Sequence, residues 1–321
     1  MSAGKILRIL TYHRVIGPEQ APHFDPRLVS ATPEMFARHM KWLAKHYHVI
    51  DMPSALAAFV SGAPLPRRAV LITFDDAYPD FLEHAWPVLR TLQLPVTLFV
   101  PTAFPDQQAP GFWWDRLYAT TLASTEAEIT DVQLGRLSLH TRQDRERSAR
   151  IMQGHVKSLQ HTEAMMWVDD VCRRLASQEI VTPATLGWDD LKILSEEGVT
   201  IGAHSRTHPL MTRISNQQVS DEISGAQQDI ETMLGKALPI FCYPGGAYND
   251  AVCSIAKDAG IELGFGTRLG HNNLNNCNPL CLERINMTLR TTTTVLRGRL
   301  SRVGIHADLM RHKMKMYLRG N

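Results

Sequence analysis

The sequence predicts an α/β fold in which about seven strands of a barrel-like parallel sheet are surrounded by helices. Short apolar runs alternate with segments of helical periodicity, and this rhythm favours parallel pairing of the strands. The unusual polar residues of the chain follow the predicted strands instead of preceding them. In barrels of this kind the chemistry collects at the carboxyl ends of the strands, so the two patterns agree.

The first part of the chain contains three predicted strands and two predicted helices. The strands are Ile6–Tyr12, Ala69–Phe74 and Val96–Val100. The first helix begins after Thr32, a good N-cap residue that is followed by proline at the first helical position. Its apolar face is formed by Phe36, Met40 and Leu43. The second helix is predicted around Phe81–Leu92.

The alternation of strands and helices resumes in the last part of the chain. Strands are predicted at Val199–Ala203, Pro239–Tyr243, Ile261–Gly266 and Leu282–Met287. Helices are predicted at Trp188–Glu197, Asn216–Leu234, Asp250–Ala259 and Thr292–Arg302. Glycine follows each of the first three, as expected at a helix C-terminus. We interpret the basic tail, Arg311–Asn321, as a solvated terminus.

Residues 104–185 interrupt this rhythm and predict a helical insertion within a single domain that spans residues 1–321. Few β-branched runs occur there, and Gln143–Val156 and Ala164–Leu175 have helical patterns. An aromatic cluster of Phe112, Trp113 and Trp114 stands at the entry. The tryptophans have two interpretations: they pack the insertion onto the core, or they form a platform for the apolar face of a sugar ring.

Composition excludes several classes of protein. The formal net charge is +2 and 21% of the residues are charged, so we expect no nucleic-acid partner. No apolar run reaches the roughly 18 residues of a membrane span, and Arg8 interrupts the apolar run near the N-terminus that a secretory signal would need. The odd number of cysteines and the lack of a CxxC pair favour a reducing compartment. We therefore expect a cytoplasmic protein without a membrane span.

The strongest chemical signal is a set of carboxylates and imidazoles at two strand ends. Asp75 and Asp76 end a buried strand, where adjacent carboxylates need a cation or a shared proton, unless one of them only caps a helix. His204 and His208 follow another strand four positions apart, so a helical turn would place both imidazoles on one face; two unrelated loop histidines are the alternative. Two histidines plus a carboxylate are typical of a catalytic site for a divalent metal.

Two weaker signals lie at other strand ends. The turn that begins with Tyr243 contains Gly245 and Gly246, whose backbone N–H groups could approach a ligand and stabilise an oxyanion, although an ordinary turn would look the same. His13 follows the first strand, where a structural histidine is equally plausible. No GxSxG elbow, P-loop or GxGxxG motif is present, which disfavours serine hydrolases, kinases and dinucleotide-binding enzymes.

Three motifs together resemble those of the polysaccharide deacetylases, carbohydrate esterase family 4. They are TFDD at Thr73–Asp76, HSRTH at His204–His208 and FCYPGG at Phe241–Gly246. The resemblance covers roughly residues 6–110 and 187–286 and implies a distorted (β/α)7 barrel. It also implies that Asp75 is the general base and that Asp76, His204 and His208 bind a divalent metal. That metal is usually Zn²⁺ in the family, although other divalent ions serve.

The sequence departs from the usual family pattern at two places. The late Leu-x-His motif that supplies the general acid has no clear match, but Tyr12-His13 resembles the strand end that carries this histidine in the permuted poly-N-acetylglucosamine deacetylases. The resemblance therefore implies that His13 is the general acid. Many members have arginine where this chain has Cys242, and that arginine orients the base. We expect Arg284, at another strand end, to replace it.

The resemblance implies removal of N-acetyl groups from N-acetylated oligo- or polysaccharides, with a backbone N–H near Gly245 holding the oxyanion. Because no signal peptide is seen, a lipid-linked or nucleotide-linked sugar is a further expected substrate. Two other classes stay open: a metal-dependent amidase acting on non-sugar C–N bonds, and a non-catalytic glycan-binding protein. Assays that compare N-acetyl sugars with cyclic amides distinguish a deacetylase from an amidase. Analysis of bound metal distinguishes an enzyme from a non-catalytic glycan-binding protein.

Overall fold

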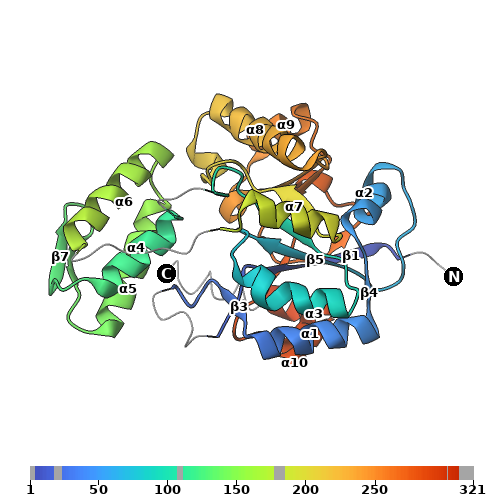
Figure 1. Ribbon diagram of the computed structural model, residues 1–321, viewed down its shortest axis with the longest axis horizontal. Helices are drawn as coiled ribbons and strands as arrows, with labels where there is room; N and C mark the ends of the chain where they lie inside the picture. Colours follow the sequence, from blue (N-terminus) through green and yellow to red (C-terminus); the bar gives the residue numbers. More distant parts are fainter. Residues whose placement is uncertain (1–3, 18–23, 107–110, 177–184, 302, 311–321) are drawn as a thin grey trace.

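The computed structural model describes residues 4–17, 24–106, 111–176, 185–301 and 303–310. Seven parallel strands form the central sheet (Figure 1). Across the sheet they are β11 (Leu263–Phe265), β10 (Ile240–Cys242), β9 (Thr200–Ala203), β6 (Thr97–Val100), β5 (Ala69–Asp75), β1 (Ile6–Tyr12) and β13 (Ile285–Asn286). Each of them overlaps one of the predicted strands, so the predicted fold class is confirmed.

The sheet curls until one segment, residues 282–286, joins its two ends. Leu282 makes a parallel bridge with Phe265 of β11, and β13 pairs in parallel with β1 a few residues later. Two short strands extend the sheet elsewhere: β12 (Asn272–Asn273) runs antiparallel to β1, and β4 (His48–Val49) runs parallel to the start of β5. The result is a distorted barrel whose strands present their carboxyl ends on one face.

Side chains on β1 alternate between two apolar cores, as expected of a strand that is buried on both faces. Leu10 and Tyr12 belong to the large core between the sheet and the helices, whereas Leu7 and Ile9 belong to the core inside the barrel. The helices around the sheet are α1 (Pro33–His46), α3 (Trp86–Thr91), α7 (Trp188–Glu196), α8 (Asn216–Leu234), α9 (Asp250–Asp258) and α10 (Thr293–Leu300). A helix that we did not predict, α2 (Met52–Val60), packs on the inner core.

The predicted helix termini are largely as the sequence indicated. Thr32 caps α1 because its side-chain oxygen accepts from the N–H of Met35. Gly235 ends α8 in the left-handed conformation that glycine adopts without strain. The helix predicted around Phe81–Leu92 differs, since its first turn is a π-helix, Phe81–Ala85, which precedes α3. Pro87 lies in the first turn of α3 and has no N–H to donate, so regular α-helical bonding cannot run through this point.

The insertion forms a lobe of its own beside the barrel (Figure 1). Its helices are α4 (Trp113–Ala123), α5 (Arg142–Val156) and α6 (His161–Leu175). They share a small apolar core to which Leu117, Met152 and Val168 contribute. The prediction of helices in α5 and α6 is confirmed, and α4 begins in the aromatic cluster.

Several short strands were not predicted. The insertion contains a hairpin of β7 (Glu128–Asp131) and β8 (Gly135–Ser138), whose alternation of apolar and polar residues is too brief to stand out. After β1, the strands β2 (Arg14–Val15) and β3 (Val29–Ala31) form a small parallel pair. Residues 311–321, the predicted basic tail, lie outside the described residues.

None of the helices that the structure describes combines the length and apolar character needed to cross a membrane.

Glycine at position 264 of β11 is required by a close approach of the chain to its neighbours. A Cβ there would lie 2.4 Å from the carbonyl oxygen of Leu280 and 2.6 Å from the hydroxyl oxygen of Tyr243. We predict that Gly264→Ala lowers the free energy of unfolding by about 1–3 kcal/mol, because the backbone and a buried ring must shift. The urea concentration at the unfolding midpoint measures this loss.

Gly154→Ala is the matched control, because nothing lies within 4 Å of a Cβ at that position in α5. There the substitution should raise the free energy of unfolding by about 0.5–1 kcal/mol through helix propensity. Unchanged stability of Gly264→Ala would contradict the close packing of β11.

Candidate active site

The predicted site residues converge because parallel strands bring their carboxyl ends to one edge of the sheet. Asp75 is the last residue of β5 and Asp76 is the next. His204 directly follows β9, and His13 directly follows β1. Cys242 ends β10, which is the neighbour of β9 in the sheet.

Asp76, His204 and His208 form a compact trio. The Oδ1 atom of Asp76 lies 3.5 Å from the Nε2 atom of His204 and 3.4 Å from the Nε2 atom of His208. The two Nε2 atoms are 3.2 Å apart. All three residues are poorly exposed, so the charge of Asp76 is not stabilised by water and needs a partner inside the protein.

The backbone that carries the trio is held in unusual conformations. Asp76, Ser205 and His208 have φ angles of 74°, 63° and 58°, in the left-handed region that costs non-glycine residues about 1–3 kcal/mol each. The Ser205 hydroxyl accepts a hydrogen bond from the His208 N–H at 3.0 Å and stabilises this turn. The two histidines therefore meet through a strained turn and not through the helical turn that the sequence suggested.

One hydrogen bond sets the orientation of His204. Its Nδ1 atom lies 2.7 Å from the carbonyl oxygen of Cys242, an acceptor, so Nδ1 carries the proton and donates it. The Nε2 atom is then left with a lone pair directed at Asp76 and His208. A backbone carbonyl behind a histidine is the usual arrangement for a metal ligand.

The trio fits a divalent metal. Oδ1 of Asp76 is buried and has no hydrogen-bond partner among the described residues. Ligand atoms about 2.0–2.1 Å from a tetrahedral zinc ion are about 3.4 Å from one another, which is close to the three separations in the trio. The ligand atoms, two imidazole nitrogens and one carboxylate oxygen, are those found in catalytic zinc sites that keep a position open for water.

Asp75 does not share this trio, because Arg284 binds both of its oxygens. The guanidinium donates to Oδ1 at 2.8 Å and to Oδ2 at 2.7 Å. Burial raises the pKa of Asp75. The charge and hydrogen bonds of Arg284 lower it, and together with nearby histidines they outweigh burial, so the pKa lies below its usual value. Asp75 is therefore an ionised carboxylate at neutral pH.

Arg284 is itself fully buried and fixed by other parts of the barrel. It donates to the carbonyl oxygen of Gly266 at 2.6 Å and contacts the sulfur of Cys242 at 3.2 Å. The small side chain at position 242 thus leaves space for a guanidinium that arrives from another strand. These contacts are the ones expected of an arginine that orients Asp75, and the role stays a prediction.

His13 lies on the open side of Asp75. Its Nε2 atom is 3.9 Å from Oδ2 of Asp75, and 28% of its side chain is exposed, against 2% for Asp75. The N–H of His13 donates to the Ser30 hydroxyl at 2.9 Å, which fixes the backbone at the end of β1. His13 is thus placed between the buried carboxylate and the solvent, and its role as general acid stays a prediction.

The structure separates the two residues that the sequence placed in an oxyanion site. Tyr243 is fully buried; its N–H donates to Phe265 in the sheet and its hydroxyl faces the sulfur of Cys253. It is therefore not brought to the candidate active site, because both of its polar groups point into the core. Gly245 adopts a φ of 59° in the turn after β10 and lies against the side chain of Leu210.

The sequence interpretation missed a buried network that connects the insertion to the trio. The Trp114 ring packs edge-on against His208, with ring centres 4.6 Å apart. Its Nε1 atom donates to the hydroxyl of Tyr78, which donates to Asp115 at 2.7 Å. Burial raises the pKa of Asp115 to about 7. Trp114 therefore packs the insertion onto the core, which is the first of the two interpretations of the tryptophans. The aromatic cluster of Phe112, Trp113 and Trp114 was the sequence signal that could have located this network.

Residues 62–264, more than half of the chain, match the sequence profile of the polysaccharide deacetylase family, and the chain belongs to this family. The YxkH protein of Bacillus subtilis (strain 168) is 20% identical over 236 residues, which are 73% of this chain and 58% of YxkH. The poly-beta-1,6-N-acetyl-D-glucosamine N-deacetylase of Escherichia coli (strain K12) is 32% identical over 119 residues, 35% of this chain and 17% of that protein. The chain thus matches only part of the length of these relatives.

Solved structures show the same fold at low sequence identity. The deacetylase PplD of Streptococcus pyogenes, in complex with acetate, superposes with a TM-score of 0.62 at 18% identity, over 92% of this chain and 98% of PplD. IcaB of Ammonifex degensii superposes with a TM-score of 0.61 at 17% identity, over 93% of this chain and 99% of IcaB. The distorted barrel is therefore the family fold.

The pairing of Asp75 with Arg284 makes a prediction about stability and pH. Arg284→Met should lower the free energy of unfolding by about 3–5 kcal/mol, because it leaves a buried carboxylate without its cation. The pKa of Asp75 would then lie above its unfolded value of about 3.9, so the variant should lose more stability as the pH rises through the new pKa. Urea unfolding at pH 5.5 and pH 8 measures both effects.

In the wild type the change of stability with pH is opposite. The lowered pKa of Asp75 stabilises the fold at pH values above the pKa that Asp75 has in the unfolded chain, and this stabilisation is lost as the pH falls. Adding Asp75→Asn to Arg284→Met should recover stability and remove the extra loss at pH 8. Arg268→Met, which breaks an exposed pair with Glu283, is the control and should change stability by less than about 1 kcal/mol. A single Arg284 variant as stable as the wild type would refute the buried pair.

Proposed function

We propose that this protein is a metal-dependent hydrolase that removes N-acetyl groups from N-acetylated sugars. The observation that carries the proposal is the placement of the trio Asp76, His204 and His208 beside an ionised Asp75 at the carboxyl ends of the strands. Family membership and relatives named as N-deacetylases of poly-beta-1,6-N-acetyl-D-glucosamine support it.

Asp76, His204 and His208 would hold the metal, most plausibly Zn²⁺, because the ligand atoms and their spacing suit that ion. A divalent ion held there would supply Lewis-acid polarisation and a more acidic water. Asp76 neutralises part of the positive charge, and the carbonyl of Cys242 fixes the ring of His204 so that its free nitrogen faces the site.

Asp75 acts as the general base in this proposal. Arg284 keeps its carboxyl group ionised and fixes its plane, while each oxygen retains a lone pair that can accept a proton. The water that attacks the acetamide carbonyl gives its proton to Asp75. A base with a lowered pKa is weak, so Arg284 contributes orientation more than basicity.

His13 acts as the general acid. Once the tetrahedral intermediate forms, breaking its C–N bond requires a proton on the sugar nitrogen, because an amide anion is a poor leaving group. Protonated His13 donates that proton, and acetate and a free amino sugar result. The oxyanion would be stabilised by a backbone N–H near Gly245, in a turn that is tied to β10.

The sugar itself would bind against the insertion. A cavity of about 240 Å³ beside His208 is lined by Phe112, Trp113 and Trp114 together with Thr207. Aromatic faces suit the apolar face of a pyranose, so the second interpretation of Trp113 is kept as part of this proposal. The substrate is an N-acetylated oligo- or polysaccharide, or a lipid-linked or nucleotide-linked sugar.

The roles of Asp75 and Asp76 predict different consequences of replacing each. Asp75→Asn should lower the rate of acetate release from N-acetylglucosamine oligomers by about 10²–10⁴ while the protein still binds metal, because only the base is lost. Asp76→Asn should lose both metal and activity. Acetate release and metal content after reconstitution with Zn²⁺ measure the two properties.

Asp189→Asn, on the exposed side of α7, is the control and should match the wild type in both measurements. Equal acetate release from Asp75→Asn and the wild type would remove Asp75 from its role. Failure of the reconstituted wild type to release acetate from any N-acetylated sugar, with turnover of cyclic amides instead, would replace the proposal with the amidase function.

The role of His13 predicts a dependence on the leaving group. His13→Gln should slow deacetylation of an N-acetyl sugar by about 10²–10⁴, because the amine must be protonated as it leaves. The same variant should hydrolyse 4-nitrophenyl acetate at nearly the wild-type rate, because 4-nitrophenolate leaves without a proton. The exposed His140→Gln serves as control. An equal loss with both substrates would show that His13 only maintains the structure of the site.

A further inference from the structure

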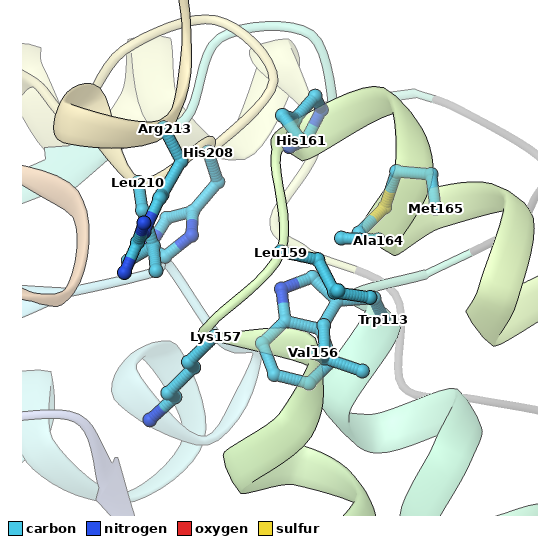
Figure 2. A pocket seen from close by; sticks show the side chains of 10 residues that line it. All are labelled: Trp113, Val156, Lys157, Leu159, His161, Ala164, Met165, His208, Leu210 and Arg213. Carbon is cyan, nitrogen blue, oxygen red and sulfur yellow. The ribbon is translucent and has the colours of Figure 1, made fainter. Parts of the chain in front are cut away.

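Two contacts hold separate segments of the chain together around the candidate active site. The first joins the insertion to the loop after β9, beside His208 (Figure 2). Trp113 and Leu159 line it from the insertion and Leu210 lines it from the loop. The cavity left between them has a volume of about 20 Å³, room for about one water molecule, so this contact packs the insertion against the barrel.

The second contact joins α9 to the segment that closes the barrel, and it contains a pair of thiols. Cys253 lies on α9, and Cys281 ends the 3₁₀ turn Pro279–Cys281, directly before residues 282–286. Their Sγ atoms are 3.3 Å apart although 28 positions separate them in the chain, and both are free thiols. A disulfide bond is about 2.05 Å long, so the sulfurs need to approach by only about 1.2 Å to form one.

The groups around the two sulfur atoms hold them in this contact. Cys253 belongs to the large core, where the hydroxyl of Tyr243 lies 3.9 Å from its sulfur and its thiol faces the carbonyl oxygen of Leu280 at 3.8 Å. The side-chain amide of Asn278 donates to the sulfur of Cys281 at 3.5 Å. Because both thiols are already positioned, little conformational freedom is lost when they react with each other.

The two thiols differ in access to solvent. Cys281 is partly exposed, whereas Cys253 is only 8% exposed, so a small reagent reaches Cys281 first. Burial and the neighbouring Cys253 thiol raise the pKa of Cys281 to about 12, so little thiolate is present at neutral pH and its reactions are slow. Slow exchange suits a cross-link that persists once it has formed, and not a pair that turns over in catalysis.

We propose that Cys253 and Cys281 form a reversible disulfide, which links α9 to the barrel-closing segment when the protein meets a low-molecular-weight disulfide. The Cys281 thiolate attacks one sulfur of the small disulfide, whose S–S bond breaks and releases one small thiol. The Cys253 thiolate then attacks the Cys281 sulfur of this mixed disulfide and releases the second small thiol. The two protons lost by the protein end on the two small thiols, and the two electrons lost by the protein reduce the small disulfide.

The position of the cross-link gives it a structural consequence. Cys281 lies three positions before Arg284, whose guanidinium binds both oxygens of Asp75. The loop closed by the disulfide contains β11, the strand that Leu282 joins by its parallel bridge. Closing this loop restricts the unfolded chain and opposes local opening of the barrel at Arg284. In a reducing environment the thiols stay free, so this added stability depends on the redox conditions.

Peptide mapping of the native protein tests whether the cross-link forms. Incubation with oxidised glutathione at pH 8.5 should join Cys253 to Cys281 in one pair of peptides, and dithiothreitol should separate them. Cys277→Ser removes another partly exposed thiol of the same loop, and this matched control should form the same cross-link. Cys253→Ser should leave a glutathione adduct on Cys281 without a cross-link.

Urea unfolding and hydrogen exchange test the consequence. Cross-linked wild type and cross-linked Cys277→Ser should unfold at a urea concentration about 0.5–1 M higher than their reduced forms. Exchange of the backbone N–H groups of residues 279–286 should slow by about 10-fold. Cys253→Ser treated in the same way should show neither change.

Three results would overturn the proposal. They are the lack of a Cys253–Cys281 linkage in the treated native protein, a linkage that forms only in urea, and a cross-linked protein that unfolds at the same or a lower urea concentration than the reduced one.

Discussion

The ion pair of Arg284 and Asp75 is the interaction on which the rest of the site depends. Arg284 comes from the segment that joins the two ends of the sheet, and it reaches the end of β5 inside the barrel. The same guanidinium donates to a carbonyl that follows β11 and contacts the sulfur at the end of β10. Closure of the barrel and orientation of Asp75, the proposed base, therefore depend on the same side chain.

The trio depends on a different kind of constraint, a strained backbone that packing enforces. Three residues in left-handed conformations bring Asp76 and His208 to His204, and the Trp114 ring supports His208 from the side of the insertion. The Trp114–Tyr78–Asp115 chain of hydrogen bonds ties that support to the turn that follows β5. The insertion is thus part of the wall of the site and not an appendage, since it shields one face of a proposed ligand.

The sequence predicted the seven main strands because short, largely apolar segments alternate with helical patterns. It predicted a metal site of two histidines and a carboxylate because such groups at strand ends are costly without a cation, and the family resemblance selected Asp76 as that carboxylate. It did not predict the short strands β2, β3, β7 and β8, where two to four residues give no usable period. It placed Tyr243 in the site because of its position in a motif, but the direction of a side chain at a strand end depends on register.

The lobe leaves the barrel after β6 and returns before α7, so both of its connections lie on the face that holds the site. It has an apolar core of its own, distinct from the two cores of the barrel. Substitutions along its inward rim therefore change the shape and charge that an incoming molecule meets without repacking the strands. In the proposed enzyme, this architecture separates the residues that would cleave the bond from the surface that an incoming molecule would meet, so that either part can change in sequence without repacking the other.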